Sequence, residues 1–247
     1  MKTSVCMATY NGGAFVLRQL QTILQQLAPG DEVIVVDDCS SDNTVSTIES
    51  INDSRIVILR NEENCREVLS FSRAIENASG DVVFLADQDD VWLPGRIALM
   101  SNSLMSSNAW LVTTNFSWVN ADEKPLSVPF DGVRSSDSKR HWKNIFDIFL
   151  GRTNYFGCAM AFRRELVPVI TPIPEYVESH DLWIALAANA KRLNLHLDDV
   201  TFLKRSHESN ATSTVSDRSL ILKLRARGIF LRSLFDLGMR RRVQQVG

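Results

Sequence analysis

The sequence contains few cysteines and no long hydrophobic run, and both absences exclude classes of protein. Its four cysteines (Cys6, Cys39, Cys65 and Cys158) are widely spaced and form no C-x-x-C pair. This spacing is unlike that of a zinc ribbon or a disulfide scaffold and favours a reducing, intracellular compartment. No segment approaches 18 uninterrupted apolar residues, and the opening stretch "MKTSVCMATYNGG" has too short an apolar part for a signal peptide. We therefore expect a cytoplasmic protein.

Two nucleotide-binding fingerprints are also absent. The chain has no G-x-x-x-x-G-K-[ST], which argues against a P-loop hydrolase. The loop after the first predicted strand reads "TYNGG" rather than G-x-G-x-x-G. Without these glycines the backbone cannot closely approach the pyrophosphate of a dinucleotide. Asp37 or Asp38 could mimic the ribose-binding acid of a dehydrogenase, but without the glycines a nicotinamide-dependent enzyme is disfavoured.

What the chain does contain is a regular alternation of strand-like and helix-like segments in its first hundred residues. The predicted strands cover residues 3–9, 32–37, 55–60 and 81–87. The predicted helices cover residues 15–27, 41–51 and 67–78, and another begins at Pro94. This order predicts an α/β fold, with a mostly parallel central sheet and helices on both faces.

The pattern is less regular beyond residue 107. We expect strands at 110–118 and 157–162, a helix over 179–193 and a long polar loop over 119–140.

Parallel strands present their carboxyl ends at one edge of a sheet, which is where ligands of such sheets bind. The residues just beyond the predicted strand ends are Thr9–Asn11, Asp37–Asp38, Arg60–Asn61 and Asp87–Asp90. We expect these residues to converge on one cleft.

Three aspartates, Asp87, Asp89 and Asp90, follow the fourth predicted strand within four positions. At about 4 Å and an effective dielectric near 20, each like-charge pair costs about 4 kcal/mol. A turn before the next helix would account for one aspartate, but three need a further explanation. A divalent cation, Mg²⁺ or Mn²⁺, would relieve the repulsion, because such ions bind carboxylates together with substrate phosphates. The cluster therefore predicts a site for a nucleoside diphosphate and a divalent cation.

Several segments, taken in order, resemble the pattern of family 2 glycosyltransferases with the GT-A fold. They are "MATYNGG", "VIVVDDCSSDNT", "ASGDVVFLADQDDVWLPGRI", "GCAMAFRREL", "SHDLWIALAA" and "HESNAT". The HDLW segment is most similar to a rhamnosyltransferase-like bacterial branch. The resemblance implies a GT-A domain over 1–215, with a nucleotide-sugar-binding half (1–107) and an acceptor-binding half (108–215).

The resemblance also implies roles for individual residues. Those expected to bind the nucleotide-sugar are Thr9, Tyr10, Asn11, Asp37, Asp38, Arg66, Asp87 and Gln88. The metal would be held by Asp89, the more direct ligand, with Asp87 and His207. The loop "NEENCREVLSF" lacks the glycine that commonly follows the asparagine in the family, which leaves the role of Arg66 open.

Asp181 matches the general base of the family's ED motif, although this chain has Ser179-His180 where an acid usually precedes it. Its position in the first turn of a predicted helix favours an ionised carboxylate, because the helix dipole stabilises an anion there. The dipole alone would also explain an acid at this position. The catalytic assignment therefore rests on the resemblance.

The resemblance implies an inverting, metal-dependent transferase in cell-surface polysaccharide biosynthesis. It would move a sugar, rhamnose in the branch named above, from a nucleoside-diphosphate-sugar to a glycan or lipid-linked saccharide. Two alternatives stay open. A nucleotidyltransferase could use a similar sheet and acidic metal site, and a non-catalytic sugar-nucleotide or membrane-binding module would bind without turnover.

Charge is unevenly distributed along the chain. Seven of its 27 Lys and Arg residues, but only one of its 29 acids, Asp236, follow residue 218, so the preceding residues carry a net charge of −8. We predict a basic amphipathic helical tail over 216–247. Such a helix suits peripheral contact with an anionic membrane, but a solvated face on a packed helix would give the same pattern, and both interpretations stay open. Nucleic acid is a disfavoured partner, because the body is acidic and has no recognised nucleic-acid module.

Overall fold

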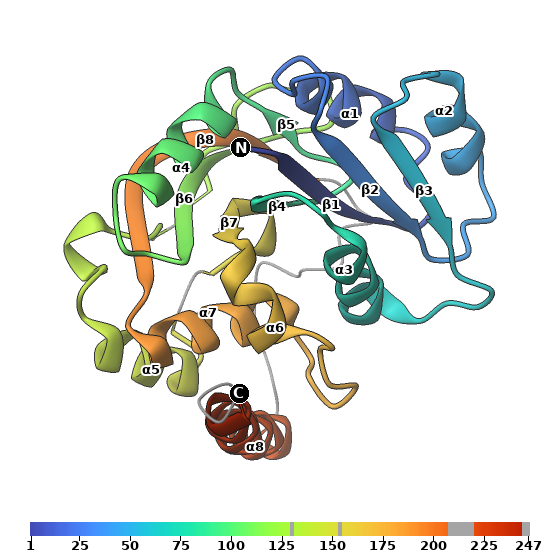
Figure 1. The fold of residues 1–247 in the computed structure, drawn as a ribbon. Helices are drawn as coiled ribbons and strands as arrows, with labels where there is room; N and C mark the ends of the chain where they lie inside the picture. The colour runs from blue at the N-terminus through green and yellow to red at the C-terminus, as the bar shows by residue number, and fades with distance from the viewer. Residues whose placement is uncertain (129–130, 153–154, 207–219, 244–247) are drawn as a thin grey trace.

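The computed structural model describes residues 1–128, 131–152, 155–206 and 220–243 (Figure 1). The strands are β1 (Thr3–Thr9), β2 (Glu32–Asp37), β3 (Ile56–Arg60), β4 (Val82–Ala86), β5 (Val91–Trp92), β6 (Leu111–Val119), β7 (Met160–Arg163) and β8 (Asn194–Arg205). The α-helices are α1 (Val16–Leu24), α2 (Thr44–Ser50), α3 (Arg66–Asn77), α4 (Arg96–Met105), α5 (His141–Leu150), α6 (Val167–Ile170), α7 (His180–Lys191) and α8 (Leu220–Val243). Short 3₁₀ turns cover η1 (Ser135–Asp137), η2 (Gly157–Ala159) and η3 (Arg164–Leu166).

The strands form one curled, mostly parallel sheet in the order β3-β2-β1-β4-β7-β6-β8-β5. The first four strands pair in parallel, as the alternation of the first hundred residues predicts. Strand β7 is antiparallel to both β4 and β6 and so joins the two halves of the sheet. The carboxyl ends of β1, β2 and β4 therefore lie at one edge.

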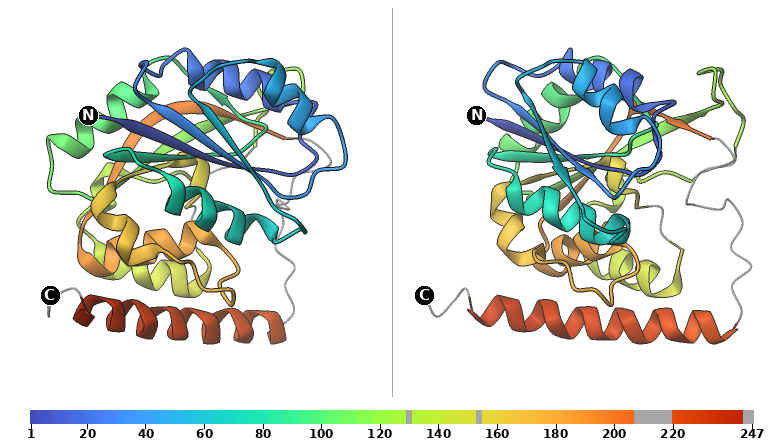
Figure 2. Two further views of the ribbon diagram at one scale, coloured as in Figure 1. Left: turned by 45° about the vertical axis from the view of Figure 1, so that its right-hand side comes forward. Right: turned by 90° about the vertical axis from the view of Figure 1, so that its right-hand side faces the viewer.

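Helices cover both faces of this sheet, as expected (Figures 1 and 2). Alternate residues of each central strand enter opposite cores, which explains why the strands are nearly continuous apolar runs. Cys6 of β1 packs with Phe71 of α3 and Trp183 of α7. The next residue, Met7, packs on the other face with Leu20 of α1 and Met100 of α4.

The second half differs from the sequence prediction in three places. Residues 157–159 form the 3₁₀ turn η2, and only 160–163 form a strand. Strand β8 and helix α5 were not predicted at all. The central Asp198-Asp199 pair of β8 interrupts its apolar pattern, and both residues lie outside its buried stretches. Strand β8 matters for the site, because its last residues, Lys204 and Arg205, reach the acidic turn after β4.

Helix α8 confirms that the tail is helical, and it runs along one side of the body as a separate rod (Figure 2). Among the described residues, no helix is both long and apolar enough to cross a membrane.

The carboxylate of Glu32, at the start of β2, joins the opposite edge of the first strands. It accepts hydrogen bonds from Ser4 Oγ at 2.6 Å, Ser79 N at 2.7 Å and Lys2 Nζ at 2.8 Å. Burial alone would raise the pKa of Glu32, but these donors outweigh it and lower the pKa to about 2.

We predict that Glu32→Gln lowers the free energy of unfolding by about 2–3 kcal/mol at pH 7, because each unit of pKa depression corresponds to about 1.4 kcal/mol. A depressed carboxyl pKa stabilises the fold above the unfolded-state pKa, and this contribution is lost as the pH falls from about 4.5 towards 2. The deficit of the variant should therefore shrink in urea titrations at pH 4.5 and pH 3. A deficit independent of pH, or an equal one in the exposed control Glu175→Gln, would contradict the assignment.

Candidate active site

The loops after β1 and β2 meet at the carboxyl edge of the sheet. Thr9 Oγ1 donates to Asp37 Oδ1 at 3.0 Å, and Asp37 also accepts Ser40 Oγ at 2.6 Å. Asp38 Oδ1 accepts Asn61 Nδ2 at 2.7 Å and the backbone N–H of residue 65 at 2.8 Å. Both aspartates are buried. Their carboxylates thus hold the neighbouring segments together through hydrogen bonds. Direct contact of Asp37 or Asp38 with a nucleotide stays a prediction.

Two hydrogen bonds between the Tyr10 backbone and the Gln88 side chain, which we call the Tyr10–Gln88 lock, join the loops after β1 and β4. The N–H of Tyr10 donates to Gln88 Oε1 at 3.0 Å, and Gln88 Nε2 donates back to the Tyr10 carbonyl at 3.1 Å. A Cβ at Gly12 would lie 2.0 Å from Gln88 Oε1, so a larger residue there would have to displace the Gln88 side chain from these hydrogen bonds. The ring of Tyr10 is exposed at this edge of the sheet, and Asn11 Oδ1 accepts the N–H of Ser41 at 2.9 Å. The predicted convergence of these loops is therefore observed.

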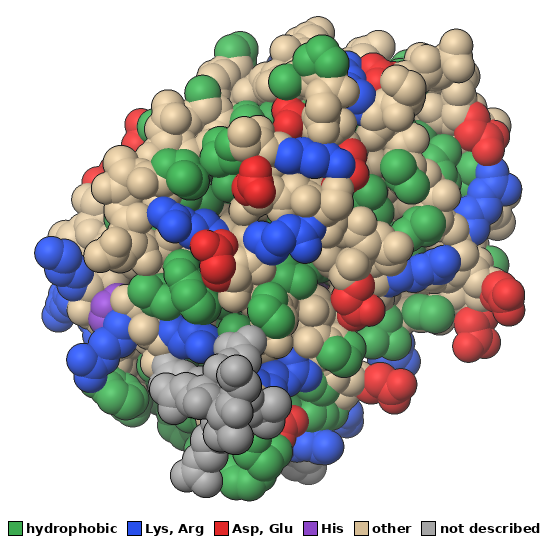
Figure 3. All heavy atoms as spheres, in the orientation of Figure 1, with side chains coloured by type: hydrophobic (Ala, Val, Ile, Leu, Met, Phe, Trp, Pro, Cys, Tyr) green, Lys and Arg blue, Asp and Glu red, His purple; other side chains and the backbone are tan. Residues whose placement is uncertain are grey.

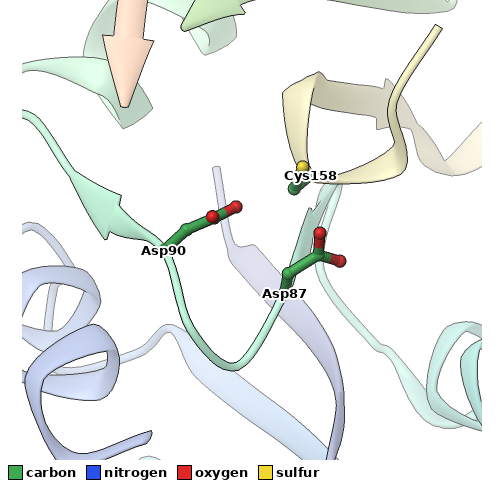
Figure 4. A group of neighbouring side chains, drawn as sticks. All are labelled: Asp87, Asp90 and Cys158. Atoms are coloured by element: carbon green, nitrogen blue, oxygen red, sulfur yellow. The ribbon is translucent and has the colours of Figure 1, made fainter. Parts of the chain in front are cut away.

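Asp87, Asp90 and Cys158 point towards one another (Figure 4). Their ligand atoms lie within 4.8 Å of each other, which is a spacing that could hold a metal ion. The ammonium of Lys204 lies beside all three, at 2.9 Å from Asp87 Oδ2, 3.9 Å from Asp90 Oδ2 and 3.5 Å from Cys158 Sγ. The repulsion expected among these acids is thus relieved in part by a cation from the chain itself.

Burial dominates the electrostatics of this cluster, where Asp90 is 0% exposed and the Lys204 side chain 7%. Burial and the neighbouring Asp87 and Asp89 raise the pKa of Asp90 to about 7, against the opposing charge of Lys204. Burial also acts to raise the pKa of Asp87, but the adjacent ammonium outweighs it and lowers that pKa. The pKa of the Cys158 thiol is raised well above its usual value by burial and by Asp87.

The carboxylates of the Asp87–Asp90–Cys158 group are suitable ligands for a divalent cation. Mg²⁺ and Mn²⁺ prefer oxygen ligands, whereas a buried thiol with a raised pKa is a poor ligand for a hard ion. The side chain of Asp87 remains 32% exposed and can reach a ligand that enters from solvent. Asp89 lies in the same turn, and its carbonyl accepts Arg205 Nε at 2.9 Å. Asp89 is outside the compact Asp87–Asp90–Cys158 group, so its role as the more direct ligand stays a prediction.

Asp181 lies in the first turn of α7, which Ser179 caps by accepting the N–H of Leu182 at 3.3 Å. His180 precedes it and is buried, with its ring stacked on Phe71 at a centroid distance of 4.1 Å. His180 Nε2 lies 3.2 Å from Asp181 Oδ1, which is an ion-pair distance.

Contacts of Gly157 link Asp181 to the group formed by Asp87, Asp90 and Cys158. A Cβ at this glycine would lie 2.5 Å from His180 Nε2, so only glycine allows the η2 turn to approach the imidazole. The next residue along the chain is Cys158, which lies against Asp87. A continuous set of contacts therefore runs from Asp181 through His180 and the η2 turn to Asp87.

The first turn of α3 contributes two more charged residues. Although Glu67 is exposed at the surface, partial desolvation by the surrounding protein, with the nearby Asp181 and Asp87, raises its pKa, while His180 and Lys204 oppose the shift. This coupling places Glu67 in the same electrostatic environment as the strand-end acids. Arg66 is exposed and has φ of 68°, a left-handed conformation that favours glycine.

Sequence reasoning missed Glu67, Cys158 and Lys204 as parts of this site, and it included Asp90 in the acidic cluster without assigning it as a ligand. A lysine in the apolar run "VTFLK" was an available signal for Lys204, but nothing in the sequence places it next to residues 87–90. His207 lies outside the described residues, so its expected position at the metal is not tested.

A separate cavity of about 320 Å³ lies between α5 and the start of β8. Tyr155 and His196 contribute to its lining, and none of the strand-end residues does. Two of its lining cations, Arg140 and Lys143, already pair with Asp137. This cavity is therefore not part of the candidate active site.

Comparison with known proteins identifies related sequences. The model of the family described as Glycosyl transferase family 2 matches residues 4–170. The dTDP-rhamnosyl transferase RfbG of Shigella flexneri is 23% identical over 219 residues, covering 83% of this chain and 72% of that protein. The UDP-Glc:alpha-D-GlcNAc-diphosphoundecaprenol beta-1,3-glucosyltransferase WfgD of Escherichia coli is 28% identical over 117 residues, covering 47% and 46%. The matches to the first curated relatives span about half the length of those proteins.

Solved structures share the fold. S. aureus TarS 1–349 in complex with UDP-GlcNAc superimposes with a TM-score of 0.68 at 20% identity, covering 95% of this chain and 73% of that one. The mannosyltransferase PcManGT from Pyrobaculum calidifontis, in complex with GDP-Man and Mn²⁺, gives 0.63 at 17% identity, covering 99% and 75%.

We predict that Lys204→Met lowers the free energy of unfolding by about 3–5 kcal/mol at pH 8, because it leaves the buried Asp90 and the half-buried Asp87 without their cation. The loss should be smaller at pH 5, where Asp90 binds a proton, and Asp90→Asn in the same chain should restore part of it. Urea titrations at both pH values measure this. The exposed Lys139→Met should change stability by no more than about 0.5 kcal/mol. A Lys204→Met variant as stable as the wild type would show that the acids do not depend on this ammonium.

The left-handed conformation of Arg66 generates a paired prediction. A non-glycine residue there costs about 1–2 kcal/mol, so Arg66→Gly should be about 1 kcal/mol more stable than Arg66→Ala. Both variants should bind a nucleoside diphosphate with Mn²⁺ about tenfold more weakly if the guanidinium contacts the diphosphate, since a hydrogen bond to a charged group contributes about 1.5–3 kcal/mol. Calorimetry measures the binding and urea titration the stability. Unchanged affinity in both variants would remove Arg66 from the nucleotide site.

Proposed function

The chain belongs to glycosyl transferase family 2 and has the GT-A fold, and from this premise we propose that it transfers a sugar from a nucleoside-diphosphate-sugar to a saccharide acceptor in bacterial polysaccharide biosynthesis. One observation carries the proposal. Contacts through His180 and the η2 turn link Asp181 with Asp87, which supports assigning both to one site. A base for the acceptor and an acid beside the donor diphosphate are the two groups that this reaction needs.

The donor would occupy the half of the sheet formed by residues 1–107. Its nucleoside would lie against the loops after β1 and β2, where Tyr10 offers an exposed aromatic face. Its diphosphate would lie towards Asp87, with Arg66 as a cationic contact. Rhamnosyl and glucosyl donors are the first to test, because RfbG is named as a dTDP-rhamnosyl transferase and WfgD as a glucosyltransferase that uses UDP-Glc.

A Mg²⁺ or Mn²⁺ ion held by Asp87 and Asp89 would stabilise the negative charge that develops on the departing diphosphate. PcManGT, which was solved with GDP-Man and Mn²⁺, supports testing manganese first. Lys204 keeps Asp87 ionised in this arrangement, because its ammonium lowers the pKa of that carboxyl.

Asp181 acts as the general base. Its carboxylate takes the proton from an acceptor hydroxyl while that oxygen forms a bond to the anomeric carbon of the donor sugar. The bond from this carbon to the diphosphate oxygen breaks, and the nucleoside diphosphate leaves with the electron pair. Attack from the face opposite the diphosphate inverts the anomeric configuration, as in the inverting enzymes that the sequence resembles.

The acceptor would enter beside α7 and the η2 turn, in the half formed by residues 108–215. A glycan or a lipid-linked saccharide fits this scheme, since either offers a sugar hydroxyl. The name of WfgD includes a GlcNAc-diphosphoundecaprenol acceptor, which supports including lipid-linked saccharides in the acceptor panel.

We predict that the protein with Mn²⁺ transfers sugar from one member of a donor panel, and that Asp181→Asn lowers the single-turnover rate by about 10²–10⁴-fold while the donor Kd stays within about twofold. Asp131→Asn, an exposed acid elsewhere, is the matched control and should be as active as the wild type. EDTA should stop transfer, and added Mn²⁺ should restore it.

The other outcomes separate the alternatives. Retained transfer in Asp181→Asn would remove Asp181 as the base. Release of pyrophosphate from a nucleoside triphosphate would identify a nucleotidyltransferase. Nucleotide binding without turnover on any donor would identify a non-catalytic module.

A further inference from the structure

Helix α8 has two apolar sides, and only one of them is covered. Ser233 and Leu237 are buried against the body, and Phe230 packs on Phe149 of α5 with ring centroids 5.3 Å apart. The opposite side of the helix faces away from the body in both views of Figure 2.

That outer side carries a row of four apolar residues, Leu224, Leu231, Phe235 and Met239, which we call the α8 stripe. Their spacings of seven, four and four residues place them on one side of an α-helix. Their exposed fractions are 60%, 60%, 67% and 48%. Four large exposed side chains in one row form a contiguous surface, unlike the scattered exposed apolar residues of an ordinary protein surface.

Positive charge borders the stripe. Arg225 and Arg232 each follow a stripe residue by one position, so they lie along one flank, and both are exposed. Each also contacts the body, since Arg225 Nε lies 3.4 Å from Glu178 Oε1 and the guanidinium of Arg232 lies 3.9 Å from the centre of the Tyr176 ring. The only acid in the sequence of α8 is Asp236, and its carboxylate accepts the hydroxyl of Tyr176 in the body at 2.5 Å. The outward side of the helix is therefore apolar, and its flank towards Tyr176 and Glu178 carries two exposed guanidiniums.

Helix α5 extends this surface beside α8 (Figure 1). Trp142 and Phe146 are 72% and 58% exposed. Phe146 stacks with Phe149, the residue that contacts Phe230 of α8. Figure 3 shows hydrophobic, Lys and Arg side chains, with some acids, around the grey residues in the lower part of the molecule.

We propose that the α8 stripe, with Trp142 and Phe146, docks onto the surface of an anionic lipid bilayer, with α8 parallel to the membrane plane. Aromatic and aliphatic side chains enter the boundary between headgroups and acyl chains, and arginines at the flank contact anionic headgroups. Helix α8 is about 36 Å long at 1.5 Å per residue, so the whole stripe can contact the bilayer at once.

The charges on α8 favour an anionic bilayer, rather than a second copy of this chain, as the partner of the α8 stripe. Two copies of the stripe packed face to face would bring Arg225 and Arg232 close to the same residues of the partner, and like charges repel. The residues before 219 carry a net charge of −8 and are repelled by an anionic surface. The molecule would therefore approach the membrane with its basic helix first.

The test is co-sedimentation of the full-length protein with vesicles at low and high salt. We expect binding to vesicles of one part phosphatidylglycerol to three parts phosphatidylcholine, weak binding to pure phosphatidylcholine, and loss of binding at high salt. Leu231→Gln with Phe235→Gln should weaken binding about tenfold or more. Met105→Gln, an equally exposed apolar residue on α4, is the matched control and should bind as the wild type does.

Several outcomes would overturn the proposal: no binding to either vesicle, equal binding to both, or a stripe variant that binds like the wild type. A wild type that is dimeric in analytical ultracentrifugation, and a stripe variant that is monomeric, would assign the stripe to self-association instead. Vesicle binding needs no turnover, so its failure would leave the proposed transferase activity untouched, and the converse also holds. Thermal unfolding of each variant shows whether it is folded before it is scored.

Discussion

The site depends on one buried ammonium. Lys204 reaches from the end of β8 to Asp87 after β4, to Asp90 in the following turn and to Cys158 in the η2 turn. These segments come from both halves of the sheet, and a second buried cation, Arg96, donates to the Cys158 carbonyl at 2.6 Å beside them. A buried ion pair of this kind adds little net stability compared with apolar residues of similar size. Removing one partner, however, strongly destabilises the fold, because the other charge is left buried without compensation. The ammonium therefore fixes the geometry of the site more than it stabilises the fold.

The remaining loops at this edge are held by acids that serve as hydrogen-bond acceptors. Asp37 and Asp38 accept donors from loops that follow three different strands, and the Tyr10–Gln88 lock joins two of the same loops. Residues in such a network have few alternative arrangements, so a ligand that binds there meets groups already in position. Arg66 is the exception, since it keeps a left-handed backbone that a glycine would adopt without strain.

The positive charges of Lys204 and of α8 lie in different environments, one buried and the other at the surface. Lys204 is buried, and its charge is set against particular carboxylates at short distances. Arg225 and Arg232 of α8 are exposed, where water and salt weaken any single pair, so their attraction to a charged surface depends on several cations acting together. If the proposed docking is correct, a transferase held at a bilayer would meet lipid-linked saccharides in two dimensions. The membrane contact and the choice of acceptor would then be parts of one arrangement.

The alternation of apolar runs and amphipathic helices was enough to predict β1 to β4, the helices between them and the edge at which their loops converge. These features are local or follow from parallel pairing, because each strand and helix carries its own periodicity. The basic tail was also visible in the sequence, since charge and helical spacing are both properties of a single segment. Glu67 and Cys158 were not identified as parts of the site, because each lies in an ordinary local pattern and gains significance only from its neighbours.

The sequence by itself determined the fold class, the acidic turn after β4 and the family. Only the tertiary structure decided how the acidic turn is neutralised, because Lys204 lies 117 residues from Asp87 along the chain and meets it only when β8 closes the sheet. It also decided which side of α8 is covered, since two apolar sides of one helix look alike until the body packs against one of them. Both outcomes depend on contacts between distant segments, and no local pattern of residues encodes such contacts.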